Sequence, residues 1–416
     1  MVNAKLEVFK KEIIEAAASV LAAIEHNPQT TTVVHHNDAD GLCAAAALLR
    51  VFKTLSLPCC LLPVEKIHEL IVEKIHDRHQ GVVFYADLGG QSSHLIGRHA
   101  AGNRLVVIVD HHLPGGKTPA QVVHLNPEHF GIDGDTEASG AAVSAYFAEQ
   151  LLRRSGVESA AVQGELALFA VLGAYGDGQF QEMELLGLNK KLLAAAIANG
   201  YLRSAERTLV VPTMGARTVA EITDILNLLG SVGFQESGPQ VAVRFLLGED
   251  QGLALQKAAN LAALREQSFE AELQRIRQGA LQQSVHVQWL DVRDRFLPMG
   301  VKAIGLFLER LIAEQLVKPD KYLVGFQHFP ESVPGVGEIG LVLTKVSARV
   351  PPALKRRIIE GLQPDLMHLL PEATRIVGGT ADGCHRFSAA SLVERGKEEA
   401  FVAALEQALI LEVTGR

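Results

Sequence analysis

Four short segments of the chain combine carboxylates with imidazoles or glycines in patterns that suit metal chemistry. The first runs His35-His36-Asn37-Asp38-Ala39-Asp40-Gly41, so that two carboxylates and two imidazoles share one turn. Carboxylates this close repel each other, and a bound cation reverses that penalty. A solvated turn in which an aspartate caps the following helix would use the same residues. This segment alone does not decide between the two interpretations.

The other three segments each place an aspartate directly after an apolar run. Asp87 follows Phe84-Tyr85-Ala86, Asp177 follows a helical run that starts at Leu166, and Asp110 is followed by His111 and His112. Taken singly, an aspartate beside glycines is ordinary turn chemistry. Imidazole nitrogen combined with carboxylate oxygen suits manganese, iron or zinc better than calcium. The four segments together predict a centre for divalent metals.

The elements around these segments indicate an α/β domain with a mainly parallel sheet. Strands are expected at 30–36, 82–86 and 105–109, and a helix at 42–51. In open parallel sheets, ligands bind beyond the carboxyl ends of the strands. The acids and histidines that follow the three strands should therefore converge.

The rest of the chain suggests three parts. Residues 1–200 are expected to form the catalytic domain, which begins with an amphipathic helix over Met1–Gln29. Residues 201–283 are expected to form a mostly helical connector with a long helix over 253–283. A smaller α/β domain should follow over 284–416, with strands that include 322–326 and 339–343.

Composition narrows the class of protein. The chain has 416 residues, 48% of them hydrophobic, but no apolar run of roughly the 20 residues that a membrane span requires. We therefore expect a cytoplasmic protein. Four cysteines without CxxC spacing fit a reduced compartment and argue against structural zinc. The net charge of −8 argues against a uniformly basic surface, so any polyanion would be bound by a local patch.

Taken together, the segments resemble the DHH phosphoesterase superfamily, which is named for the triplet that stands here as Asp110–His112. The similarity is closest to the RecJ-like branch in its shorter, archaeal-type form. It covers HNDADG at 36–41, Leu125-Asn126-Pro127, and the stretch 134–140 with Glu137 and Ser139. The resemblance implies an α/β fold with a parallel-sheet DHH domain, a helical linker and a smaller C-terminal DHH-associated domain.

The resemblance also implies two divalent ions, with Mn²⁺ favoured and Mg²⁺ as the alternative. His36 and Asp38 would hold one ion, Asp87 would bridge, and His112 would face the scissile phosphate. The second ion would be held by Asp40, His111 and Asp177. His35 and His36 compete for the histidine position, and the match to HNDADG favours His36.

Asp110 is expected to orient a neighbouring imidazole rather than to bind metal. A histidine that binds metal usually donates its other N–H to a carboxylate or carbonyl behind it. We therefore assign Asp110 to the catalytic set together with His112, but as a supporting residue.

The likeness continues into the C-terminal domain, where Lys345–Arg349 and Gly378-Gly379 resemble the substrate-binding part of the DHH-associated domain. In the family the glycines often run straight into a histidine, whereas Thr380–Cys384 intervene here. The segment 341–390 has seven basic and four acidic residues, and arginine can bind phosphate through two parallel hydrogen bonds. The substrate-binding residues implied are Ser347, Arg349, Gly378, Gly379, His385 and Arg386.

The function that the resemblance implies is a RecJ-like exonuclease on single-stranded nucleic acid or short oligonucleotides, working by two-metal activation of water. A rival is hydrolysis of small substrates such as dinucleotides, cyclic dinucleotides, nucleoside bisphosphates or polyphosphate. The aromatic content of 5% offers few platforms for stacking bases, which suits this rival. A non-enzymatic scaffold of a replication complex is the third hypothesis, and the retention of every acid and histidine argues against it. Polarity, DNA against RNA, native metal and oligomeric state stay open.

Overall fold

The computed structural model describes residues 2–26, 30–79, 81–100, 105–180, 184–205, 208–340 and 342–414. Met1 and residues 27–29 of the expected first helix lie outside this part of the chain. Two compact units contain Met1–Ala259 with Pro334–Val336, and Asn260–Val333 with Gly337–Arg416. The expected connector 201–283 is thus divided at residue 259 between the two units.

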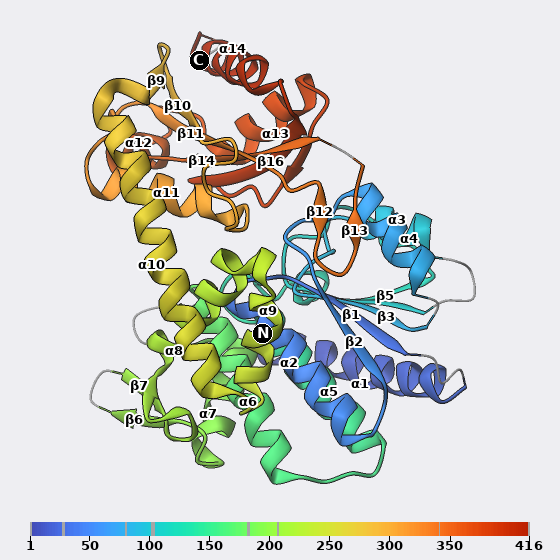
Figure 1. The fold of residues 1–416 in the computed structure, drawn as a ribbon. Coiled ribbons are helices and arrows are strands. Elements are labelled where there is room, and N and C mark those ends of the chain that lie inside the picture. The colour runs from blue at the N-terminus through green and yellow to red at the C-terminus, as the bar shows by residue number, and fades with distance from the viewer. Residues whose placement is uncertain are drawn as a thin grey trace. The chain divides into compact units, whose positions relative to one another are not determined.

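The first unit is built on a five-stranded parallel sheet, in the order β2-β1-β3-β4-β5 (Figure 1). β1, β3 and β4 are buried along their whole length and consist mainly of β-branched and aromatic residues, as strands covered on both faces require. The expected parallel sheet is therefore confirmed. The strands are β1 (Thr31–His35), β2 (Cys59–Pro63), β3 (Val83–Ala86), β4 (Val106–Val109) and β5 (Val122–Leu125).

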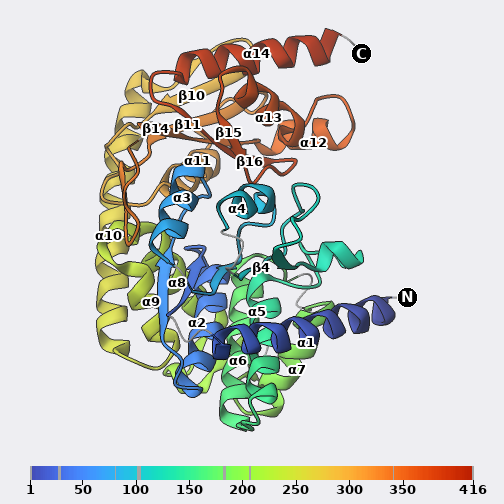
Figure 2. The same ribbon diagram turned by 90° about the vertical axis from the view of Figure 1, so that its right-hand side faces the viewer.

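Helices cover both faces of this sheet (Figure 1). On one face α2, α5 and α6 pack against one another, and a run of alanines in α2 lets the helices approach closely. α1 buries Leu6, Phe9 and Ile13 at helical spacing, and it lies along α5 and α7 (Figure 2). The helices on this face are α1 (Val2–His26), α2 (Ala39–Thr54), α5 (Gly140–Arg154), α6 (Ala160–Gly176) and α7 (Gly187–Ala198), and α3 (Glu69–Arg78) and α4 (Ser93–His99) lie on the other.

The part of the first unit after α7 was expected to be mostly helical, and it also contains a small antiparallel sheet. Its strands, β6 (Arg203–Ala205), β7 (Thr208–Val211) and β8 (Arg217–Thr218), are too short to show a clear alternating pattern. α8 (Val219–Asn227) continues into a π-helical turn at Leu228–Val232, and α9 (Gly238–Leu246) follows.

The long helix expected over 253–283 is shorter than predicted. α10 (Gln251–Arg275) continues into a π-helical turn at Ile276–Ala280, in which Gly279 has φ 96°. A residue in this left-handed conformation cannot continue a right-handed helix. Residues 281–283 therefore leave the helix, and Gln282–Gln283 form the short strand β9.

The second unit has a mixed six-stranded sheet in the order β15-β16-β14-β11-β10-β9. β10 and β11 are parallel, and the other neighbours are antiparallel. One face of the sheet carries Phe326 and Val346 into a core with Phe401 and Leu405 of α14. The remaining elements are β10 (Val287–Asp291), α11 (Lys302–Ala313), β11 (Tyr322–His328), β12 (Ser332–Val333), β13 (Gly337–Glu338), β14 (Leu343–Arg349), α12 (Pro352–Ile359), α13 (Leu366–Ile376), β15 (Thr380–Asp382), β16 (Ser388–Glu394) and α14 (Glu398–Thr414).

The prediction of a strand at 339–343 is wrong. Instead, β13 pairs with β12 and ends at Glu338, and Gly340 then takes the left-handed φ of 69°. β14 therefore begins only at Leu343. Residue 341 lies outside the described part of the chain. Among the residues that the structure describes, each helix is either too short or too polar to cross a lipid bilayer.

Candidate metal centre

Three neighbouring strands of the parallel sheet end side by side, and a polar residue follows each of them. His35 of β1 pairs with Ala86 of β3, which pairs with Val109 of β4. The next residues are His36, Asp87 and Asp110, and their backbone N–H groups continue the ladder by donating to the neighbouring strand. The sheet thus presents an imidazole and two carboxylates along one edge, at the position expected for a ligand site.

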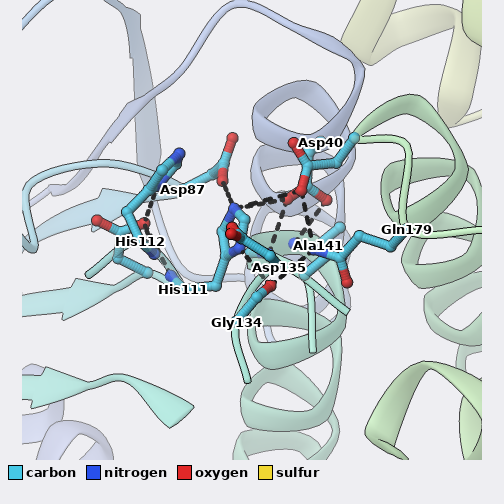
Figure 3. Close-up of polar contacts among 12 residues, drawn as sticks. Asp40, Asp87, His111, His112, Gly134, Asp135, Ala141 and Gln179 are labelled. Carbon is cyan, nitrogen blue, oxygen red and sulfur yellow. Dashed lines mark hydrogen bonds and ion pairs between the residues drawn. The ribbon is translucent and has the colours of Figure 1, made fainter. Parts of the chain in front are cut away.

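The two aspartates of the first segment belong to the start of α2. Asp38 is the N-cap, and its Oδ1 accepts a hydrogen bond from Gly41 N at 3.1 Å. Asp40 lies in the first turn, and its carboxylate accepts hydrogen bonds from the N-terminal amides Gly140 N at 2.7 Å and Ala141 N at 3.0 Å of α5. The α5 N-terminus is the positive end of a helix dipole, so it stabilises this buried carboxylate. Figure 3 shows Asp40 between Ala141 and His111.

His111 is surrounded by carboxylates from three separate segments. Its Nε2 lies 3.3 Å from Asp87 Oδ1, 3.7 Å from Asp40 Oδ2 and 3.7 Å from Asp177 Oδ2. Asp177 is the residue that ends α6, as the sequence predicted. Residues that are far apart in the chain, in α2, after β3 and at the end of α6, thus meet at the imidazole that follows β4. Figure 3 shows His111 with Asp40 and Asp87.

The donor atoms fall into groups that could each hold one cation. In each group one ligand atom per residue lies within 4.8 Å of the others. Asp87 belongs to the group with His36 and Asp38, and its Oδ1 lies 3.3 Å from Nε2 of His111 in the group with Asp40, which suits a residue expected to bridge two ions. The groups are His36, Asp38 and Asp87; Asp40, His111 and Asp177; and Asp87, Asp110, His111 and His112.

The hydrogen bonds of His111 show that its arrangement fits a metal. Nδ1 lies 2.8 Å from the carbonyl oxygen of Gly134, so this nitrogen carries the proton and donates. In the neutral imidazole Nε2 then presents a lone pair toward the carboxylates. Within the described residues, neither this Nε2 nor Asp87 Oδ1 has a hydrogen-bond partner of good geometry, although both are buried. A cation would satisfy both atoms at once.

The carboxylates also show the electrostatic cost of a centre without a cation. Burial, and next the charges of Asp40 and Asp38, raise the pKa of Asp87 well above its usual range. Burial likewise raises the pKa of Asp177 to about 6; His111 opposes this rise, and Asp40 and Asp38 add to it. Burial lowers the pKa of His111, but Asp177, Asp87 and Asp40 outweigh it and raise that pKa. Protons are held where a divalent ion would provide positive charge.

Asp110 has a different environment, rich in donors. Its Oδ1 accepts from His111 N at 2.8 Å and from His112 Nδ1 at 2.8 Å, and its Oδ2 accepts from Gly90 N at 2.7 Å. Burial raises its pKa, but His112, His111 and the amide of Gly90 outweigh burial and lower it. These contacts support the interpretation that Asp110 orients the histidines. The side chain of His112 is 30% exposed and could reach a substrate.

The two adjacent histidines of the first segment have different surroundings. His35 is buried in β1, and its Nδ1 lies 2.7 Å from the carbonyl oxygen of His36. Burial lowers its pKa to about 4. His36 Nδ1 instead lies 2.9 Å from Asp38 Oδ2 and 3.5 Å from Asp87 Oδ2. The geometry therefore favours His36 as the candidate ligand.

The backbone around the site leaves no room for side chains at two glycines. A Cβ at Gly140 would collide with Oδ1 of Asp87, and one at Gly173 would collide with Oδ1 of Asp40. Asp87 itself has φ 61°, a left-handed conformation that aspartate tolerates better than most residues. Close helix packing thus holds the carboxylates in place.

Several residues near the centre were not predicted. Gln179 Nε2 donates to Asp177 Oδ2 at 2.8 Å and to the carbonyl oxygen of Gly134 at 2.8 Å. Asn126, part of the LNP segment, donates from Nδ2 to the carbonyl oxygen of His112 at 2.9 Å. A glutamine between glycine and phenylalanine carries no signal of its own, and only its place two residues after Asp177 could have pointed to it.

The residues implied for substrate binding all lie in the second unit, and the structure brings only some of them together. Ser347 and Arg349 point from the same face of β14 toward Gly305 of α11, which leaves space for them. Arg349 Nε donates to Glu309 at 2.9 Å. Gly378 and Gly379 connect α13 to β15, and His385 N donates to Ser388 O at 2.8 Å before β16 begins. Arg386 lies 3.5 Å from Asp365 at the start of α13.

Comparison with known proteins finds a family match in the first unit. Residues 30–174 match the DHH family, N-terminal domain. An uncharacterised protein of Methanocaldococcus jannaschii is 27% identical over 199 residues, which cover 46% of this chain and 43% of that protein. The match thus spans less than half of the archaeal protein.

Solved structures extend the likeness over the whole chain. RecJ of Thermus thermophilus in complex with Mn²⁺ has a TM-score of 0.65 and 19% identity, and the match covers 96% of this chain and 55% of that RecJ. An exonuclease RecJ bound to manganese has a TM-score of 0.62 and 19% identity, covering 96% of this chain and 94% of the other. The DHH domain of a member of a ribosomal protein family has a TM-score of 0.64 and 15% identity, covering 97% and 91%. Residues 30–174 therefore match the DHH family, N-terminal domain, and the chain as a whole has a RecJ-like fold.

Proposed function

We propose that this chain is a metal-dependent phosphoric ester hydrolase that acts as a RecJ-like exonuclease on single-stranded nucleic acid or short oligonucleotides. One observation carries the proposal: His36 with Asp38, and Asp40 with His111 and Asp177, form two donor groups. One carboxylate oxygen of Asp87 lies 3.5 Å from His36 and the other 3.3 Å from His111. RecJ structures with bound Mn²⁺ and Mg²⁺ share this fold and support the choice of these two ions.

A pair of divalent ions would neutralise phosphate oxygens and make a water molecule acidic enough to attack phosphorus at neutral pH. The protein's own contribution is to hold the donors in place before substrate arrives. Asp40 is fixed by the amides of α5, and His111 by the carbonyl of Gly134. Because these groups cannot rotate, little reorganisation is required when the transition state forms.

His112 has the geometry of a group that contacts the substrate. Its Nδ1 donates to Asp110, so its Nε2 is the nitrogen left to face a phosphate. Burial lowers the pKa of His112, but Asp110 outweighs burial, and the pKa is raised. An imidazolium at this position could donate a hydrogen bond from Nε2 to a phosphate oxygen. The paired Asp110 keeps the ring oriented for this role.

Removal of metal should abolish the activity reversibly. We expect protein treated with EDTA to show no hydrolysis of a single-stranded oligonucleotide, and added Mn²⁺ to restore the rate, because in the proposed reaction the attacking water is made acidic by the ions. Mg²⁺ should restore it less well, since imidazole ligands favour Mn²⁺. Rates measured against the concentration of each ion test this. Hydrolysis at an undiminished rate in EDTA would contradict the proposal.

The small-substrate hypothesis predicts a different dependence on substrate length. Rates should be compared on a dinucleotide, on oligonucleotides of increasing length, and on polyphosphate. An exonuclease should keep or gain activity as the strand lengthens, whereas an enzyme for small substrates should be fastest on the dinucleotide or on polyphosphate. A scaffold protein would hydrolyse none of them with either ion.

We further propose that Arg349 binds a phosphate of the substrate. Its side chain is 21% exposed and already oriented by Glu309, so its guanidinium needs little ordering to bind an anion. Arg349→Ala should raise KM by about tenfold, the loss of one charge-assisted contact of ~1.4 kcal/mol, and leave kcat nearly unchanged. Arg357→Ala, on the exposed surface of α12, is the control. Equal KM values for the two variants would refute this role.

A further inference from the structure

Gln179 is a buried amide that contacts two components of the candidate metal centre. It is 1% exposed and follows α6, two residues after Asp177. Its Nε2 donates to Asp177 Oδ2 and to the carbonyl oxygen of Gly134, both at 2.8 Å. The same carbonyl accepts the Nδ1 proton of His111. One amide group thus contacts Asp177 directly and His111 through a shared carbonyl. Figure 3 shows Gln179, Gly134 and His111 of this set.

The orientation of the Gln179 amide is fixed by Asn189, which lies in the first turn of α7 and is fully buried. Asn189 Oδ1 accepts from the backbone N–H of Ser139 at 3.1 Å, so its Nδ2 must point away from Ser139. Nδ2 then donates to Gln179 Oε1 at 2.7 Å. Because Oε1 is used in this way, the N–H groups of Gln179 face Asp177 and Gly134.

The chain of hydrogen bonds returns to the third member of the same donor group. Ser139 caps α5 by accepting from Ala142 N at 3.2 Å. The next two amides of α5, those of Gly140 and Ala141, bind the carboxylate of Asp40. Asp40, His111 and Asp177 are therefore all held by one connected set of hydrogen bonds that includes Gln179 and Asn189.

We propose that Gln179 and Asn189 are positioning residues that set the affinity of the metal position formed by Asp40, His111 and Asp177, but not that of the position formed by His36 and Asp38. The inference rests on the proposed function only in taking these groups to hold divalent ions. Residues behind metal ligands typically change metal affinity by 10- to 100-fold. The donor directions of Gln179 fit this role: one N–H keeps the Asp177 oxygen in place, and the other bonds to the carbonyl that fixes the His111 proton on Nδ1.

The test is a Mn²⁺ titration of the full chain, in which electron paramagnetic resonance measures free Mn²⁺. Gln179→Met keeps the length of the side chain and removes its amide. The wild type should bind two ions. The variant should bind one with unchanged affinity and the other about 10- to 100-fold more weakly. Two ions bound with wild-type affinities in Gln179→Met would overturn the proposal.

A second variant tests whether Asn189 acts through Gln179, and it alters no group that contacts a candidate metal ligand. In Asn189→Asp, one carboxylate oxygen can still accept from Ser139, but the other faces Gln179 Oε1, and the amide of Gln179 must turn over. Its oxygen would then face Asp177 and the Gly134 carbonyl. Asn189→Asp should therefore also bind one of the two Mn²⁺ ions more weakly. The double variant should bind that ion no more weakly than Gln179→Met alone, since the two residues act as a unit. Additive losses of Mn²⁺ affinity in the double variant would argue against an effect of Asn189 through Gln179.

Gln288→Met is the matched control for loss of a buried glutamine. Gln288 is fully buried in β10, where its Nε2 donates to the carbonyls of Lys318 and Lys321 and its Oε1 accepts from Lys318 N. This variant should lose thermal stability to a similar extent and retain both Mn²⁺ affinities. An equal loss of Mn²⁺ binding in Gln288→Met would reduce the effect of Gln179 to general destabilisation. A wild type that binds Mn²⁺ but hydrolyses no phosphoester would refute the proposed function and leave this test intact.

Discussion

Asp87→Asn is expected to lose hydrolytic activity while unfolding at a higher temperature than the wild type in metal-free buffer. Asp87 lies in two of the candidate donor groups, so its loss should cost more than the loss of a residue behind a ligand. Since the latter costs up to about a hundredfold, activity should fall by more than about a hundredfold. The gain in stability has an electrostatic cause. Burial, followed by the charges of Asp40 and Asp38, raises the pKa of this carboxyl well above its usual range.

The pH dependence of this stability difference follows from the sign of the shift. A carboxyl whose pKa is raised by folding contributes its full stability below the unfolded-state pKa near 4 and loses it as the pH rises toward the folded-state pKa. Each unit of such a shift corresponds to ~1.4 kcal/mol. Asparagine does not titrate, so the difference in melting temperature between variant and wild type should be large at pH 8 and small near pH 4.

Addition of Mn²⁺ should reverse the order of stability. Only the wild type keeps both donor groups, so it should gain more from binding, and its melting temperature should rise above that of Asp87→Asn. Thermal unfolding with EDTA and with Mn²⁺ at several pH values measures both effects. Asp320→Asn, an exposed acid in the second unit, should change neither melting temperature nor activity. A less stable Asp87→Asn in EDTA would refute the crowding of carboxylates as the cause.

The location of the centre could be predicted because each central strand ends in a visible chemical signal. The apolar runs before Asp87 and Asp110 stop abruptly at a carboxylate, and parallel strands bring their carboxyl ends to one edge. The register that places His36, Asp87 and Asp110 side by side depends on pairing between strands. A single sequence does not contain that information.

The choice between His35 and His36 shows where the sequence stops being informative. Neighbouring residues of a strand point to opposite faces, so one of two adjacent histidines must point away from the site. Which one does so depends on where β1 ends, and a one-residue change of register would exchange them. The structure ends β1 at His35, and His36 then lies among the carboxylates.

The hydrogen bonds that support His111 and Asp40 could not have been predicted, unlike the bond between Asp110 and a neighbouring imidazole. The partner of His111 is the carbonyl oxygen of Gly134, and the partners of Asp40 are amides of α5, so no side chain marks either contact. Gln179 and Asn189 are ordinary polar residues in the sequence, and only their burial distinguishes them. The short strands β6–β8 were missed for a similar reason, because segments of two to four residues have no clear periodicity.

Replacement of Asp110 by asparagine is expected to destabilise the protein, the opposite of the effect of Asp87→Asn. Asp110→Asn should lower the free energy of unfolding by about 3 to 5 kcal/mol, the usual cost of breaking a buried charged pair, and also abolish activity. Both carboxylate oxygens accept N–H donors: Oδ1 from His112 Nδ1 and His111 N, and Oδ2 from Gly90 N. Whichever way the asparagine is oriented, its NH₂ group faces one of these donors. His112 also loses the charge that raises its pKa and holds its ring.

Unfolding by urea at several pH values tests the contrast between the two aspartates. Burial raises the pKa of Asp110, but His112, His111 and the amide of Gly90 outweigh it and lower the pKa. The stabilisation by Asp110 should therefore be complete above the unfolded-state pKa near 4 and disappear as the pH falls below it. The stability gap between wild type and Asp110→Asn should thus narrow in acid, whereas the gap for Asp87→Asn widens in alkali. If both variants shifted the free energy of unfolding in the same direction at pH 7, the two aspartates would not have the separate roles assigned to them, one among crowded carboxylates that need a cation and the other among donors that need an anion.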